Sequence, residues 1–200
     1  MPAGSTQTSG REVAAAYGRP VTETLRLRPA TIDDLEVLLS TETPVGASYS
    51  WRGHRDGHRL RERLNGDGLI DEDAGTLVVE AAGEAVGSVG WVARHWSAPP
   101  WSKSWEIGIT LLPEARGRGI GGRAQRQMCD YLFATTSVHR LQAVTNASNV
   151  AEQRALLSAG FSREGVVRGA EWLLGSYTDV HLFGRVRSDW EPPTELRSHL

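Results

Sequence analysis

The stretch Arg116 to Gly122, Arg-Gly-Arg-Gly-Ile-Gly-Gly, has the composition of a ligand-binding loop. An apolar, strand-like segment precedes it over Trp105–Leu112, and a helical pattern follows it over Arg123–Phe133. Glycines let a backbone approach a ligand closely, and the first N–H groups of a helix carry partial positive charge. The stretch therefore predicts a turn in which main-chain N–H groups bind phosphate.

Three ligand loops and a plain turn compete for this stretch. Gly117, Gly119 and Gly122 satisfy the dinucleotide pattern G-x-G-x-x-G. That pattern also needs an acidic residue roughly 20 positions on, after a second strand, and the sequence has none there. The nucleotide-triphosphate loop needs Gly-Lys-Ser/Thr, which does not follow here. The third pattern, Arg116-x-x-Gly119-x-Gly121, resembles the acyl-CoA pyrophosphate loop of the GNAT superfamily of N-acetyltransferases. A glycine-rich turn without a ligand is the remaining alternative.

Hydrophobic periodicity and capping signals predict the elements that must position this loop. Their order is β-α-α-β-β-β-α-β-α-β-β, which is also the order of the GNAT fold. The expected segments are strand 24–28, a helix from Thr31, helix 56–64, hairpin 76–81 and 85–93, strand 105–112, helix 123–133, strand 139–145, a helix from Asn149 to Ser158, and hairpin 161–173 and 177–186.

The second half of the chain resembles the branch that acetylates the N-termini of ribosomal proteins (RimJ/RimL-like). The matching positions are Asn149, Gly160-Phe161, Glu164-Gly165, Gly175, Tyr177 and Asp179. The resemblance covers roughly residues 25–186. It implies a mixed α/β fold whose central, mostly antiparallel sheet is splayed between its fourth and fifth strands and flanked by about four helices.

The resemblance also implies acetyl-CoA as the acyl donor, bound without a metal. The turn would hold the pyrophosphate, two strand residues would pair with the pantetheine amides, and Asn149 would either hold another amide or only cap its helix. The expected cofactor-binding residues are Leu111, Leu112, Arg116, Gly117, Arg118, Gly119, Ile120, Gly121, Gly122, Arg123 and Asn149. The six histidines show no metal-ligand spacing.

The reaction needs a base, because a primary alkylamine has a pKa of about 10.4 and arrives protonated. Glu106, on the strand before the turn, is the first candidate, with a purely structural carboxylate as the alternative. Glu152 is the second, because it replaces the Ser that lies near the CoA sulfur in many relatives. A carboxylate there would repel a departing thiolate unless it is protonated or turned away. The tyrosine acid of many relatives is replaced by Leu156.

Two aromatic segments are the candidates for binding the acceptor. Tyr49 and Trp51 lie in the irregular stretch that corresponds to the family's acceptor loop. Trp96 and Trp101 lie in a loop that contains prolines. Such side chains favour an apolar or planar acceptor, with a homodimer contact as the alternative.

Composition sets the broad class of the protein. The 200 residues include 40% hydrophobic and 23% charged residues, and the net charge of −2 implies no nucleic-acid surface. One cysteine excludes an internal disulfide, and no apolar run reaches the length of a membrane span. No secretory signal is recognised, so a cytoplasmic location is expected. The expected division is an N-terminal tail over 1–21, the transferase domain over 22–187 and a C-terminal tail over 188–200.

The sequence therefore predicts an acetyl-CoA-dependent N-acetyltransferase in which a primary amine attacks the thioester directly. One alternative keeps the fold but uses a different acyl donor in small-molecule metabolism or resistance. A second is a non-catalytic CoA-binding module, suggested by the missing tyrosine and by the replacement of Ser with Glu152. The acceptor stays open among a protein N-terminus, an antibiotic or other amine metabolite, and a polyamine.

Overall fold

The computed structural model describes residues 24–40, 49, 56–98 and 102–194. The predicted N-terminal tail, Trp51 and Trp101 lie outside these residues. The predicted element order is confirmed. The elements are β1 (Leu25–Pro29), η2 (Ile32–Asp34), α1 (Leu35–Ser40), α2 (Gly57–Gly66), β2 (Ala74–Ala81), β3 (Glu84–His95), β4 (Lys103–Leu111), η3 (Pro113–Ala115), α3 (Ile120–Thr135), β5 (Arg140–Asn146), α4 (Val150–Ser158), β6 (Ser162–Leu173), β7 (Ser176–Val186) and η4 (Arg187–Asp189), where η marks a 3-10 turn.

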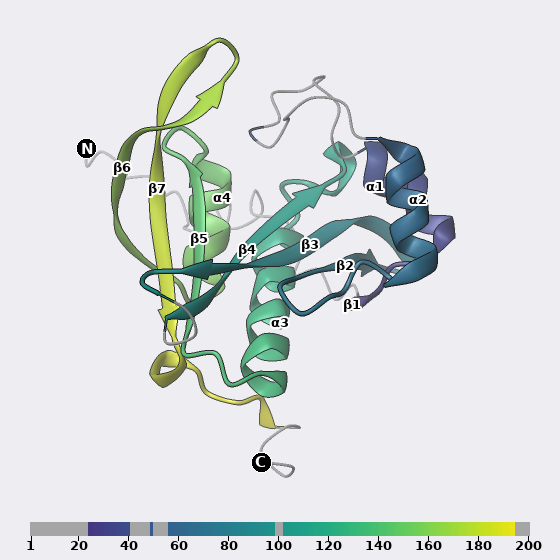
Figure 1. The fold of residues 1–200 in the computed structure, drawn as a ribbon, viewed down its shortest axis with the longest axis horizontal. Helices are drawn as coiled ribbons and strands as arrows, with labels where there is room; N and C mark the ends of the chain where they lie inside the picture. Colours follow the sequence, from purple (N-terminus) through teal and green to yellow (C-terminus); the bar gives the residue numbers. More distant parts are fainter. Residues whose placement is uncertain (1–23, 41–48, 50–55, 99–101, 195–200) are drawn as a thin grey trace, which may run out of the picture.

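The strands form one sheet in the order β1-β2-β3-β4-β5-β7-β6 (Figure 1). Every neighbouring pair is antiparallel except β4 and β5, which α3 connects as a parallel crossover. These two strands pair only at Trp105 with Leu141 and at Glu106 with Gln142. Beyond these pairs β4 and β5 diverge, so the predicted fold class and the splay between the fourth and fifth strands are confirmed.

Helix α3 supplies much of the core beside the sheet. Its buried side chains recur with helical spacing and include Ile120, Ala124, Met128, Leu132 and Phe133. Cys129 is fully buried among them, and this burial raises the pKa of its thiol to about 12. The cysteine therefore stays protonated at neutral pH and acts as a packing residue.

Helix α3 begins at Ile120, three residues earlier than the predicted start at Arg123. Two glycines in its first turn make it a poor helix by propensity, but tertiary packing holds it. Ile120 is buried in the core, and a Cβ on Gly122 would lie 2.1 Å from the hydroxyl of Ser158 in α4. Close approach of α3 and α4 therefore requires Gly122, and residues 120–122 belong to the helix rather than to the turn.

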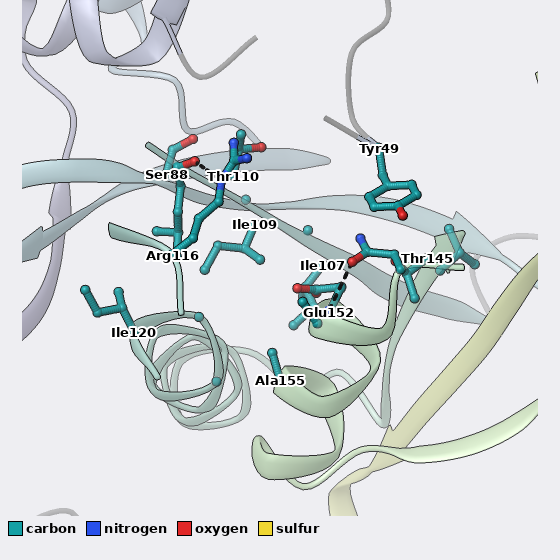
Figure 2. A pocket seen from close by; sticks show the side chains of 18 of the residues that line it. Tyr49, Ser88, Ile107, Ile109, Thr110, Arg116, Ile120, Thr145, Glu152 and Ala155 are labelled. Carbon is teal, nitrogen blue, oxygen red and sulfur yellow. Dashed lines mark hydrogen bonds between the residues drawn. The ribbon is translucent and has the colours of Figure 1, made fainter. Parts of the chain in front are cut away.

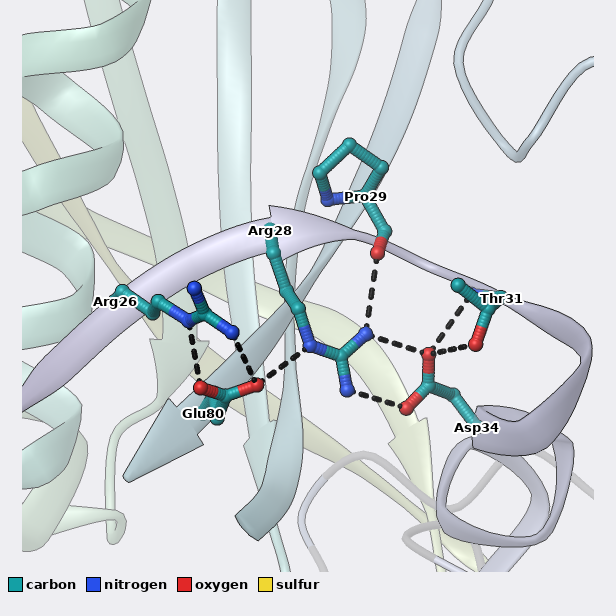
Figure 3. A network of polar contacts seen from close by, with 6 residues as sticks. All are labelled: Arg26, Arg28, Pro29, Thr31, Asp34 and Glu80. Atoms are coloured by element: carbon teal, nitrogen blue, oxygen red, sulfur yellow. Dashed lines mark hydrogen bonds and ion pairs between the residues drawn. The ribbon is translucent and has the colours of Figure 1, made fainter. Parts of the chain in front are cut away.

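A charged network joins the first strand to its surroundings (Figure 3). Arg28 of β1 donates to Glu80 of β2 at 2.7 Å and to both oxygens of Asp34 in η2 at 2.7 and 2.8 Å. Arg26 donates to the same Glu80 at 2.6 Å. The main-chain N–H of Thr31 also donates to Asp34, at 2.8 Å. The network therefore connects β1, β2 and the first helical turn.

The first residues of the predicted C-terminal tail pack against α3. The indole Nε1 of Trp190 donates to Asp130 at 2.9 Å, and its ring centroid lies 5.6 Å from that of Phe133. Arg187, the last residue before the predicted tail, donates to the carbonyl groups of Phe133, Thr136 and Val138, where α3 ends and β5 approaches.

Within the described ranges, no helix is both long and apolar enough for a membrane span.

Candidate functional site

A cavity of about 1040 Å³ lies where β4 and β5 diverge. Its walls come from β2, β3, β4, the turn before α3, the first turn of α3, the end of β5, α4, and single residues of β6 and β7. Figure 2 shows Arg116 and Ser88 together in one part of this cavity and Tyr49 and Thr145 in another. The volume is at the upper end of the range of about 300–1,000 Å³ typical for small-molecule sites, so an extended ligand fits.

The glycine turn forms one part of the cavity wall. Gly117 and Gly119 line the cavity in the left-handed conformation, with φ of 71° and 73°. This conformation is strained for other residues, and no other atom lies within 4 Å of where a Cβ would stand. The N–H groups at the start of α3 follow directly, so main-chain donors are accessible for an anion such as a pyrophosphate.

Two more of the predicted cofactor-binding residues line the cavity beside the glycine turn. Arg116 lines the cavity, and its Nε donates to the carbonyl of Leu111 at 3.0 Å, which fastens the turn to β4. Gly121 also lines it, and a Cβ there would lie 3.8 Å from both Leu111 and Ala155. A larger side chain at position 121 would therefore fill space in the cavity without straining the helix.

Leu112, Arg118 and Arg123, three residues of the predicted cofactor set, do not line the cavity. The main-chain N–H of Leu112 donates to Val86 at 2.9 Å, and its carbonyl accepts from Ala115 at 3.0 Å. The backbone of Leu112 is thus already paired within the protein, which leaves Leu111 as the lining residue of the expected pair.

Glu152 faces the cavity from the first turn of α4. Asn149 caps this helix: its side-chain oxygen accepts the Glu152 N–H at 3.2 Å, and both residues line the cavity. Figure 2 shows Glu152 among the side chains that line the cavity. Burial raises the pKa of Glu152 to about 7, and the neighbouring amide of Gln125 opposes this rise in part. The carboxyl can therefore take up or release a proton near neutral pH.

Glu106 occupies a different environment at the point where β4 and β5 part. Its Oε1 accepts from Arg94 at 2.9 Å, and its Oε2 accepts from the Gln142 amide at 3.0 Å. Its side chain lines the cavity and is 18% exposed. Glu106 is thus a carboxylate held beside a cation, whereas the environment of Glu152 favours proton exchange.

Glu171 of β6 is a third carboxylate of the cavity wall that the sequence did not indicate. Its Oε2 accepts from the amide of buried Asn146 at 3.1 Å, and the same amide donates to Thr178 at 2.9 Å. Tyr49, one of the predicted acceptor residues, lines the cavity, and its hydroxyl lies 3.4 Å from the carbonyl of Ser148. No local motif marks Glu171 or Asn146, because strand pairing alone brings them here.

Trp96, which the sequence predicts to contact the acceptor, is not among the residues that line the cavity. Its indole donates to Gln142 at 2.8 Å, and the guanidinium of Arg140 lies 5.3 Å from its ring centroid. The ring is therefore held against β5 by these two residues.

The described residues contain no group of three or more His, Cys, Asp and Glu side chains arranged to hold a metal ion.

Comparison with known proteins gives one family match and several relatives. A protein-family profile described as an acetyltransferase (GNAT) domain matches residues 24–162. An uncharacterized N-acetyltransferase of Bacillus licheniformis is 23% identical over 175 residues, which cover 84% of this chain and 96% of that protein.

Two solved structures have the same fold. The spermidine N-acetyltransferase of Vibrio cholerae, in complex with CoA and spermine, has a TM-score of 0.71 and 23% identity and covers 82% of this chain and 96% of its own. A ribosomal-protein alpha-N-acetyltransferase, RimL, in complex with coenzyme A has a TM-score of 0.68 and 22% identity, with 84% and 96% covered. At such identities the likeness establishes the fold.

Proposed function

The chain belongs to the acetyltransferase (GNAT) family, and on that premise we propose that it transfers the acetyl group of acetyl-CoA to an amine that binds as a cation and, once deprotonated, attacks the thioester directly. One observation carries the choice of acceptor. Among the residues that the structure describes, Glu106, Glu152 and Glu171 add three carboxylates to the wall of the cavity that begins at the glycine turn. A cavity with main-chain N–H donors and carboxylates suits an anionic donor and a cationic acceptor.

Acetyl-CoA supplies the activated acetyl group, and the residues of the turn are suited to receive its phosphates. Gly117 and Gly119 expose their backbone, and Gly121 leaves space beside the first turn of α3. Arg116 adds a positive charge on the same wall. The carbonyl and N–H groups of β4 beyond Glu106 have no β5 partner in the strand register, which leaves that edge for an extended ligand.

Glu152 is the residue to which we assign proton transfer. Its carboxylate, with a pKa of about 7, can accept one proton from the bound ammonium, and the neutral amine that results attacks the thioester. The nitrogen loses its second proton as the C–S bond breaks, the departing thiolate takes up that proton to leave as the thiol, and Glu152 returns its own proton to solvent. Glu106, the first candidate by sequence, is paired with Arg94 and Gln142. Its proposed role is to attract and orient the amine by its negative charge.

The number of carboxylates favours an acceptor with two or more amino groups. One ammonium group needs one close carboxylate, whereas three carboxylates from the described part of the chain line this cavity. A polyamine or diamine is therefore our first choice, and the amino terminus of a peptide, which the RimJ/RimL-like resemblance suggests, is the second. A homodimer and a cytoplasmic location stay predictions from the sequence.

The proposal is tested by incubating the purified chain with acetyl-CoA and an amine panel. The panel contains spermidine, putrescine and a peptide with a free N-terminal serine, and thiol release is measured beside mass spectrometry of the amines. We expect thiol release and acetylated product with spermidine or putrescine. Acetylation of the peptide alone would reverse the acceptor choice.

Two further arms test the alternatives. Faster transfer from propionyl-CoA than from acetyl-CoA would establish a different acyl donor. Calorimetric binding of CoA without transfer to any amine would indicate a non-catalytic binding module. Absence of both binding and transfer would contradict the proposed function altogether.

A further inference from the structure

A chain of two hydrogen bonds connects Trp96 to the Glu106 carboxylate through Gln142. The Trp96 indole donates to the Gln142 Oε1 at 2.8 Å, and the Gln142 Nε2 donates to the Glu106 Oε2 at 3.0 Å. The three residues come from the loop after β3, from β5 and from β4. The chain therefore spans segments that are far apart in sequence and that meet where the cavity begins.

This hydrogen-bond chain lies at the point in the sheet where β4 and β5 separate. Glu106 and Gln142 form one of the two register pairs that join β4 to β5, and the strands diverge beyond them. Gln142 is buried, with 6% of its surface exposed, whereas Trp96 is 59% exposed and covers it from outside. A buried amide needs both of its polar atoms paired, and the two neighbours supply these partners.

The donor and acceptor chemistry fixes the orientation of the Gln142 amide. An indole N–H can only donate, so Gln142 must present its oxygen to Trp96. The amide nitrogen then points to Glu106, whose carboxyl oxygen Oε2 accepts its hydrogen bond. Without the indole N–H, the amide could rotate and present its oxygen to the carboxylate, which would repel Glu106 instead of holding it.

The second partner of Glu106 is a weaker constraint. The Arg94 side chain is 49% exposed, and ion pairs at such positions contribute little because water and salt screen them. The contact with Gln142 is the buried one, so it is the one that restricts where the carboxylate lies.

We infer that Trp96 and Gln142 are positioning residues that hold the Glu106 carboxylate in the orientation that receives the acceptor amine. The inference rests on the proposed function, because it concerns the acceptor part of the same cavity. It gives Trp96 an effect on acceptor binding without contact between the indole and the acceptor.

The substitution Trp96→Phe removes the indole N–H and keeps an aromatic ring at this position. We expect the KM for the acceptor to rise about 3- to 10-fold, which corresponds to one lost hydrogen bond, while the KM for acetyl-CoA holds. Trp190→Phe is the matched control, because it removes an indole hydrogen bond of similar length, to Asp130, away from the cavity. An unchanged acceptor KM in Trp96→Phe would overturn the inference, and an increase found only in Trp96→Ala would favour an aromatic wall.

A double-variant cycle tests whether the two residues act along one path. Gln142→Leu removes the amide, so Trp96→Phe in that background should add little to the rise in acceptor KM. Fully additive effects would overturn the inference, because independent effects exclude a shared path through Gln142.

An NMR measurement tests the chain without relying on catalysis. The ¹⁵N–¹H signal of the Trp96 indole is identified by its loss in Trp96→Phe. Glu106→Ala should shift this signal through Gln142 and leave the Trp190 signal in place. A Trp96 signal that does not respond would overturn the inference even in an active enzyme. A responding signal in a chain that acetylates no amine would support the hydrogen-bond chain and reject the proposed function.

Discussion

The Glu152 carboxyl must change its protonation state near neutral pH if it takes the proton of the amine. Because burial raises its pKa to about 7, we expect kcat to increase with pH through about 7. Glu152→Gln should lower kcat roughly 10²- to 10⁴-fold and remove this increase, while calorimetric affinity for CoA holds. A variant with near-normal turnover and the same pH profile would move the proton transfer to another group.

The same side chain should reduce stability in alkaline solution. An ordinary glutamate has a pKa of about 4.3, so the folded state binds the Glu152 proton more tightly than the unfolded state does. The stability that this proton contributes is complete below about pH 4.3 and is lost as pH rises through about 7. Glu152→Gln should therefore raise the melting temperature at pH 8 relative to the wild type and change it little at pH 4, as measured by thermal unfolding.

At the scale of elements, the N-terminal turn of α3 determines how closely a ligand can approach the protein. Gly121→Val would place a branched side chain in the cavity beside Leu111 and Ala155. We expect affinity for acetyl-CoA to fall at least tenfold, about 1.4 kcal/mol, with the fold retained. Calorimetry with CoA measures this change.

Gly66→Val is the matched control for this substitution. Gly66 is the last residue of α2, is not a lining residue of the cavity, and has open space where a Cβ would stand. The Gly66→Val variant should bind CoA with the same affinity as the wild type. A folded Gly121→Val chain that also binds CoA normally would reject the assignment of this turn to the cofactor.

For the whole molecule, acid stability depends on the network of Arg28, Glu80 and Asp34 (Figure 3). The hydrogen bonds from Arg28 hold the pKa of the buried Asp34 carboxyl below its usual range. Its stabilisation is present above the ordinary aspartate pKa of about 3.9 and is lost as pH falls through the lower folded value. The pH dependence of this stabilisation is therefore opposite in direction to that of Glu152, whose contribution is lost as pH rises.

Asp34→Asn tests this contribution. It removes one partner of a largely buried ion pair, so we expect a loss of about 3 kcal/mol at pH 7, or roughly 6–12 °C in the melting temperature. The difference from the wild type should shrink below about pH 4. Asp33→Asn, at the exposed neighbouring carboxylate, is the control and should have little effect. An equal loss at pH 3 and pH 7 would show that charge is not the cause.

The sequence by itself determined the element order, the glycine turn and the cap at Asn149, while the family came from the resemblance of its motifs to known members. These features rest on signals between residues close in the chain. Hydrophobic spacing defines a helix or a strand, a side-chain oxygen caps the helix that follows it, and glycine permits the left-handed turn. Such signals need no knowledge of which strands become neighbours. They placed Glu106 and Glu152 on the right elements as candidates.

Only the tertiary structure decided how the candidate residues differ. The Glu106 carboxylate is 36 residues from the Gln142 that holds it, and Gln142 is 46 residues from Trp96. Glu171 reaches the cavity through pairing of distant strands, and Leu112 is withdrawn because Val86 accepts its N–H. The pKa of Glu152 depends on neighbours that other elements bring to it. Register, burial and hydrogen bonding join residues that are distant in sequence, so these properties do not exist until the chain has folded.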